Sequence, residues 1–319
     1  MNGFFYISLI ILILSDFANA GLDAWDYKDK QRYISTKIEA QKFSLTVASL
    51  DENNENFQQY SGYVCLRVKS PSYTSPWKKI YFKNQTKKRI DLTINRSIGG
   101  KESAVIELKK VENSCLENSR IYESSDKFTI RPLKFVFSVP KNLKSQKRYL
   151  FKNAIKAINA KGEISKSYNF DNLTLSYTKR DRNLKPDSSL KGELKSKPIT
   201  FKEGVSDLEI SFSDTANILL KLIDENYCKI DKESPNSIKG ETDINFLIDH
   251  FNLKFISPPS FKNAHENYTY LSNDLNMSAF IENLSLIIEA AGEANKTLFN
   301  YKDPKDRYFA NLLDINQTA

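Results

Sequence analysis

Residues 43–47 (FSLTV) alternate apolar and polar side chains with a period of two, and this pattern decides the fold. Successive side chains of a β-strand point to opposite faces of a sheet, so the alternation is typical of a half-buried strand. The same pattern returns in short runs between residues 32 and 313, with no sustained helical period. The sequence therefore predicts an all-β fold.

The alternating runs group into three units behind a leader. The sequence predicts β-sandwich units over residues 21–132, 133–235 and 236–319. Pro132 interrupts the first ladder, and the polar segment 231–241 (DKESPNSIKGE) is typical of a linker. Many short strands in units of about a hundred residues indicate tandem Ig-like sandwiches. The third unit is shorter than the other two, so an incomplete sandwich is one of the alternatives for it.

The third unit is expected to begin with residues 246–251 (FLIDHF). Later strands are predicted over residues 268–271, 279–291 and 297–301. Residues 281–294 also fit a helical period of 3.6, and the strand is favoured because its neighbours are strands.

A signal peptide is predicted over residues 1–20. Residues 4–14 (FFYISLIILIL) form an apolar run too short to span a bilayer of about 30 Å as a helix. The A-x-A sequence at residues 18–20 predicts cleavage before Gly21. The alternative is a buried strand or helix of a cytosolic protein. No later run is long enough for a transmembrane segment, so the mature chain is expected in the periplasm, on the outer-membrane surface or outside the cell.

Three cysteines, Cys65, Cys115 and Cys228, are consistent with one disulfide in an oxidising compartment. A bridge between Cys65 and Cys115 would close a loop of about fifty residues and stabilise the fold by about 4 kcal/mol. Cys228 is then left over, either buried or paired with another chain. The alternation in residues 64–68 (VCLRV) puts Cys65 on the face opposite the apolar side chains, which predicts a peripheral bridge rather than a core one.

Charge and motifs point away from nucleic acid and catalysis. The net charge is +8, but lysine is spread along the chain and mixed with acids, as on a solvated surface. No nucleophile elbow, zinc-binding helix or phosphate loop occurs, and the two histidines, His250 and His265, look structural. The scattered cysteines do not form a zinc site. The sequence predicts a non-enzyme without cofactor or metal.

Two kinds of candidate site remain. Asn276, Asn295 and Asn316 stand in N-x-S/T triplets with an acid two residues earlier, a pattern that looks like a bacterial oligosaccharyl-transfer acceptor and suggests glycosylation. Tyr73 and Trp77 lie in residues 70–77 (SPSYTSPW), a candidate contact loop, with ordinary turn chemistry as the alternative. On this hypothesis Trp77→Ala leaves the fold intact and weakens attachment.

Several motifs in order resemble the MshQ-like secreted proteins of mannose-sensitive haemagglutinin type IV pilus systems. They are residues 23–26 (DAWD), 32–37 (RYISTK), 43–50 (FSLTVASL), 125–132 (SDKFTIRP), 246–251 (FLIDHF), 268–271 (YTYL), 300–301 (NY) and 308–310 (YFA). The resemblance implies Ig-like β-repeats on an exported protein and supplies no catalytic residues. This chain is shorter than such proteins usually are.

The resemblance implies an exported, non-catalytic β-repeat protein of the bacterial envelope, associated with type IV pilus biogenesis or surface adhesion. Its expected partners are pilus or cell-envelope proteins. The alternative is a periplasmic or surface glycan-binding module, because aromatic rings stack on sugars and a lysine-rich surface attracts anionic surface glycans.

Overall fold

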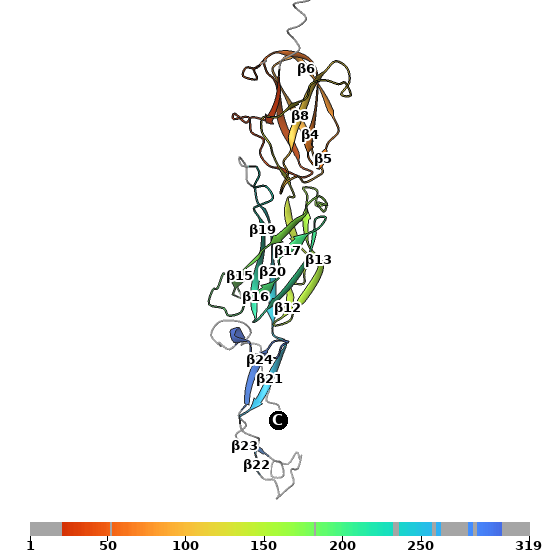
Figure 1. The fold of residues 1–319 in the computed structure, drawn as a ribbon. Coiled ribbons are helices and arrows are strands. Elements are labelled where there is room, and N and C mark those ends of the chain that lie inside the picture. Colours follow the sequence, from red (N-terminus) through yellow and green to blue (C-terminus); the bar gives the residue numbers. More distant parts are fainter. Residues whose placement is uncertain are drawn as a thin grey trace, which may run out of the picture.

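The computed structural model describes residues 21–51, 53–181, 183–231, 236–256, 260–262, 280–282 and 286–301. The regular elements in these ranges are β-strands and one short 3-10 turn, η1 (Phe299–Tyr301), so the predicted all-β class is confirmed. The sheets follow one another from the N-terminal to the C-terminal part along an elongated molecule (Figure 1). In this described part, no helix is long and apolar enough to cross a membrane.

The first unit is a sandwich of two sheets. One sheet has the order β1-β3-β7, and the other has the order β5-β4-β8-β9, with β6 also paired with β4. This division of early and late strands between the sheets is that of an Ig-like sandwich. The strands are β1 (Leu22–Asp26), β2 (Lys37–Ile38), β3 (Lys42–Ser49), β4 (Tyr60–Ser70), β5 (Tyr73–Thr74), β6 (Lys78–Gln85), β7 (Lys87–Thr93), β8 (Val105–Val111), β9 (Tyr122–Glu123) and β10 (Ile130–Arg131).

The apolar residues of the alternating sequence pattern form the core of this unit. Val64, Leu66 and Val68 of β4 are fully buried between the two sheets. Arg67 and Lys69 lie on the other face of the same strand, where both pair with Glu107 of β8. One strand thus supplies both the core and the outer face of its sheet.

The motifs that carry the family resemblance bind one another within the first unit. Asp23 of β1 accepts hydrogen bonds from the backbone N–H and the hydroxyl of Ser125, at 2.9 and 3.0 Å. Asp126 accepts one from the N–H of Ile34 at 2.7 Å. These partners are 102 and 92 residues apart in sequence, and β2 pairs in parallel with β10 beside them. The motifs therefore close the unit by joining its beginning to its end.

The second unit is also a two-sheet sandwich. Its two main sheets have the orders β11-β13-β18-β16 and β12-β20-β19-β15, with β12 parallel to β20, and β14 pairs with β17 in a separate two-stranded sheet. The largest buried side chains of its core are aromatic, namely Tyr168, Phe201, Phe212 and Phe246. The strands are β11 (Lys134–Phe137), β12 (Asn142–Lys144), β13 (Tyr149–Ile158), β14 (Phe170–Leu173), β15 (Leu175–Arg180), β16 (Leu194–Ser196), β17 (Ile199–Phe201), β18 (Val205–Phe212), β19 (Ala216–Asp224) and β20 (Ile238–Leu247).

The second unit extends further along the chain than the sequence predicts. β20 pairs along its whole length with β19, and its Ile238, Ile244 and Phe246 belong to the second core. A third unit that begins at residue 236 is therefore wrong. Gly240 resembles a linker residue in sequence, but a Cβ there would lie 2.5 Å from the carbonyl oxygen of Phe135. It marks the place where β11 passes close to β20.

The described residues of the third part of the chain form two antiparallel strand pairs. β21 (His250–Phe255) pairs with β24 (Leu286–Ala291), and β22 (Ser260–Lys262) pairs with β23 (Phe280–Glu282). The choice of strand over helix is confirmed for β24, whereas the strand predicted over residues 268–271 lies outside the described residues. Leu253 and Phe255 share one face of β21, and each is 61% exposed. This pair of strands therefore has an apolar, exposed face.

The strand predicted over residues 297–301 is wrong. Thr297 makes one isolated bridge with β24, and the chain then turns into η1. The buried carboxylate of Asp214 causes this turn, because it accepts the backbone N–H groups of Phe299 and Asn300 at 2.9 and 3.3 Å. η1 thereby anchors the third part to the second unit.

Candidate functional site

The first and second units meet in a tight polar contact. The N–H of Gly100 donates to the carbonyl of Tyr227 at 2.7 Å, and the N–H of Ala160 donates to the carbonyl of Glu39 at 3.0 Å. Gly99 lies so close to Tyr227 that a Cβ would be 2.5 Å from its ring. These bonds come from different loops and fix the orientation of both units. We call this contact the junction; it comprises residues 36–39 and 97–100 of the first unit and residues 160–167 and 227–231 of the second.

A buried acid at the end of β19 positions Tyr227 in the junction. The carboxylate of Asp224 accepts a hydrogen bond from the hydroxyl of Tyr168 at 2.6 Å. It also accepts the backbone N–H groups of Asn226 and Tyr227 at 2.8 and 3.0 Å. Burial raises the pKa of both tyrosines, so both hydroxyls stay protonated. The loop after β19 is therefore held by the core of the second unit.

Side chains add further bonds across the junction. The hydroxyls of Ser97 and Ser167 lie 2.8 Å apart, and the N–H of Ser97 donates to the same hydroxyl of Ser167 at 2.8 Å. Glu39 is 4% exposed and accepts a hydrogen bond from the hydroxyl of Ser165. Burial raises the pKa of Glu39, and its hydrogen bonds and the charge of Arg96 offset part of that effect. The junction thus contains a buried acid whose ionisation is costly.

Replacing Glu39 by glutamine should change how stability depends on pH. Because burial raises the pKa of Glu39 in the folded state, the folded protein holds this proton more tightly than the unfolded chain. The stability from this group is fully present below the unfolded-state pKa and is lost as pH rises from that value through the higher folded-state pKa. The free energy of unfolding of Glu39→Gln, minus that of the wild type, should therefore increase from acid to neutral pH. Urea titrations of both proteins measure it, and a difference independent of pH would contradict the burial of Glu39.

Cys228 lies within the junction as a buried free thiol, 1% exposed. Burial raises its pKa, which the hydroxyl of Thr129 and the charge of Arg131 partly offset. Of the two alternatives for the leftover cysteine, the structure shows the buried one.

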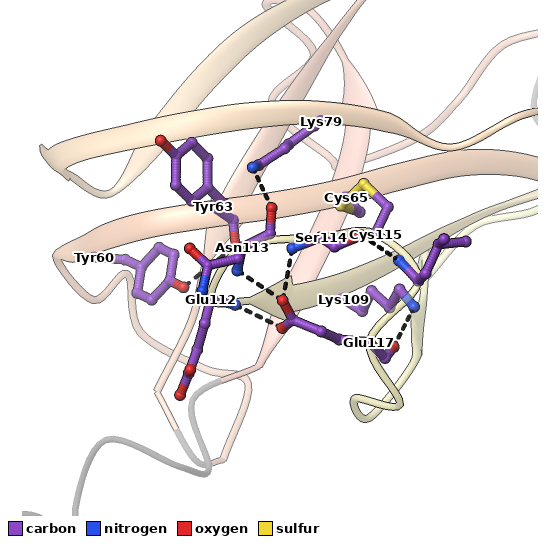
Figure 2. The surroundings of a disulfide bond; sticks show 11 residues. Tyr60, Tyr63, Cys65, Lys79, Lys109, Glu112, Asn113, Ser114, Cys115 and Glu117 are labelled. Atoms are coloured by element: carbon purple, nitrogen blue, oxygen red, sulfur yellow. Dashed lines mark hydrogen bonds between the residues drawn. A yellow bond between two sulfur atoms is a disulfide. The ribbon is translucent and has the colours of Figure 1, made fainter.

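The disulfide lies on the outer face of the first unit. The structure joins Cys65 of β4 to Cys115, in the loop that follows β8 (Figure 2). Cys65 stands opposite Lys79 of β6 and Lys109 of β8, and outside the apolar core of the unit. Cys65 itself is 0% exposed, so the bridge is covered on this outer face although it stays out of the apolar cluster between the two sheets.

A single carboxylate orders the loop that carries Cys115. Glu117 accepts the backbone N–H groups of Glu112, Asn113 and Ser114 at 2.8, 2.7 and 2.6 Å (Figure 2). These bonds lower the pKa of Glu117 and keep it ionised. Leu116, in the same loop, is 91% exposed. The outer face therefore presents a loop whose first part, residues 112–117, is held by the carboxylate of Glu117 and by the disulfide.

The structure separates the two aromatic residues of the predicted contact loop. Trp77 is half-buried on the outer face, where its ring centroid lies 4.2 Å from the guanidinium carbon of Arg67 and 4.8 Å from Nζ of Lys109. Tyr73 packs against the core of the first unit, with the guanidinium of Arg96 5.6 Å from its ring centroid. The two rings do not form one contact surface.

Trp77→Ala should therefore destabilise the fold, contrary to the expectation from sequence. Loss of two cation–π contacts should lower the free energy of unfolding by about 1–2 kcal/mol. Leu116→Ala, at a highly exposed site on the same face, is the matched control and should leave stability unchanged. Urea titration followed by circular dichroism measures both variants. Equal stability of Trp77→Ala and wild type would contradict the packing of this ring.

One of the three candidate glycosylation sites lies in the described part of the chain. Asn295 is exposed in the turn after β24, with a φ of 56°. Its side-chain oxygen accepts a hydrogen bond from Asn252 Nδ2 at 2.8 Å and lies 3.2 Å from His250 Nε2. Asn276, Asn316 and the predicted signal peptide lie outside the described residues.

No protein-family model matches the chain. No curated protein matches it either. Among solved structures, the chain is similar to FdeC, an Escherichia coli adhesin, at 8% identity and a TM-score of 0.29, over 88% of this chain and 94% of that one. It is also similar to the D0–D1 domain of intimin, at 10% identity and a TM-score of 0.22, over 71% of this chain and 97% of that one. At these scores the likeness carries no functional argument, and the Ig-like class rests on the strand order of the two sandwiches.

Proposed function

We propose that this chain is an exported, non-catalytic spacer of the bacterial envelope that serves surface attachment and works with a type IV pilus. Its units are proposed as residues 21–132, residues 133–247 and a third unit from residue 248. The observation that carries the proposal is the junction, because a spacer must transmit position from one unit to the next. Contacts between domains of one chain often leave relative motion, unless many groups hold them.

The junction supplies such groups. Backbone bonds, serine side chains and the closely packed Tyr227 act together between the two units. Outside the junction, the predicted signal peptide and the disulfide support export, because disulfides persist in oxidising compartments. The resemblance to MshQ-like proteins supports the association with pili.

Cell fractionation tests this proposal. Native protein is detected in sheared pili, outer membrane, periplasm and medium, and intact cells are treated with protease. We expect the protein to sediment with sheared pili and to be lost on protease treatment. A soluble periplasmic protein that the protease cannot reach would overturn the proposal. A periplasmic protein of known behaviour serves as the control for intact cells.

A further inference from the structure

A polar cleft opens beside the junction, between the first and second units. Its volume is about 830 Å³, within the range of about 300–1,000 Å³ that ligand sites occupy. Residues of both units line it, so it exists only because the junction fixes them relative to each other. The lining groups used below are Tyr73, Asn95 and Arg96 of the first unit and Glu163, Lys166 and Glu203 of the second.

The second unit contributes two acidic residues from turns whose backbone is held by asparagine side chains. The side-chain oxygen of Asn159 accepts the N–H of Glu163 at 3.1 Å. In the same way, Asn169 accepts the N–H of Glu203 at 2.9 Å. Glu203 has a φ of 50° and stands with Gly204 at the centre of the two-residue turn between β17 and β18, which is closed by hydrogen bonds between Lys202 and Val205. Asn159 Nδ2 also donates to the carboxylate of Glu163 at 3.2 Å, so this carboxylate is positioned before any ligand arrives. At Glu203 it is the backbone that is held.

The first unit contributes an aromatic ring and an incompletely bonded guanidinium. Nε of Arg96 is buried and has no hydrogen-bond partner among the described residues. The same guanidinium stands 5.6 Å from the ring centroid of Tyr73. A buried donor without a partner is costly, and a ligand oxygen in the cleft is one way to satisfy it.

We propose that this cleft binds a saccharide. Planar amide, carboxylate and guanidinium groups present paired donors and acceptors, which match the neighbouring hydroxyls of a sugar ring. Arg96 and Lys166 line the cleft together with Glu163, Glu203 and the buried Glu39. Because both signs of charge are present side by side, a neutral, hydroxyl-rich ligand fits better than a strongly charged one. In the described residues, no group of acids, histidines and cysteines is placed to hold a metal ion.

A ligand in this cleft touches both units at once. It therefore stabilises the junction by mass action, because it binds only the assembled pair. The inference depends on the proposed function in one respect: export places the chain where envelope and surface saccharides occur. The binding itself is tested with purified protein and does not depend on location.

The test begins with the mature chain on an array of immobilised bacterial-envelope and host oligosaccharides at physiological salt. The oligosaccharide that binds is then titrated calorimetrically against the wild type and variants. Glu203→Gln and Lys166→Ala should each weaken binding by about tenfold or more, because each removes a charged hydrogen-bonding group. Glu241→Gln and Lys134→Ala change the same residue types outside the cleft and should bind as the wild type does. Thermal melts establish that all four variants are folded.

Each outcome of the binding experiment either supports or overturns the saccharide site. Loss of binding in both cleft variants, with both controls unchanged, supports the site. An array with no bound oligosaccharide overturns the proposal. Binding that survives in Glu203→Gln and Lys166→Ala also overturns it, because the saccharide then binds elsewhere. A periplasmic location in the fractionation experiment would refute the proposed spacer role without changing any of these results.

Discussion

Replacing Cys65 and Cys115 together by alanine lowers the free energy of unfolding of the first unit by about 4 kcal/mol. The bridge spans 50 residues of sequence, so its removal frees a large loop in the unfolded chain. Within that loop lie β6, β7 and β8, which contribute to both sheets. The expected loss is a large fraction of the stability of an average domain, about 5–15 kcal/mol.

Urea titration followed by tryptophan fluorescence measures the free energy of unfolding of the first unit specifically. The only two tryptophans of the chain, Trp25 and Trp77, both lie in the first unit, so their emission reports its unfolding alone. Cys228→Ala is the matched control, because it removes a thiol that is unpaired in the structure and leaves the bridge in place. Alkylation of all three cysteines in unfolded, unreduced protein would contradict the bridge.

Phe246→Ala lowers the free energy of unfolding of the second unit by about 3–5 kcal/mol. Phe246 is 1% exposed in the second core, where its ring centroid lies 5.3 Å from that of Phe212. Truncation leaves a cavity that the paired strands β19 and β20 cannot close without losing their register. Far-ultraviolet circular dichroism should show the earlier transition, while tryptophan emission of the first unit changes much less.

This prediction decides where the second unit ends. Phe255→Ala is the matched control, because Phe255 is 61% exposed in the third part of the chain. It should leave the unfolding of the second unit unchanged. If Phe246→Ala behaved like Phe255→Ala, the assignment of β20 to the second sandwich would be contradicted, and a third unit beginning near residue 236 would regain support.

Local alternation was enough to predict most strands. In β18 and in residues 66–70 of β4, buried side chains alternate with more exposed ones, and the period of two in the sequence reflects this alternation directly. The end of the second unit could not be read in this way. Pro235 and Gly240 suggest a linker, and the decisive fact is the approach of β11 to β20, which is a long-range contact.

The junction and the cleft were not predictable because their residues look like ordinary surface residues in sequence. Glu39 and Ser97 differ from ordinary surface residues only because the second unit buries them. One signal was present: the doublet Gly99-Gly100 is unusual in a chain with only ten glycines, and glycine permits close approach of another backbone. Similarly, the sequence placed Tyr73 and Trp77 in one loop, but β5 and β6 direct their rings to different surroundings.

The central claim is that the first two units form one rigid spacer, and residual dipolar couplings test it most directly. The couplings are measured on the deuterated mature chain in a weakly aligning medium, and alignment tensors are fitted separately to residues 21–131 and 133–247. A rigid junction predicts one common tensor, with the same magnitude and orientation for both units. Tensors of different magnitude would show that the units move independently, and this would contradict the spacer account.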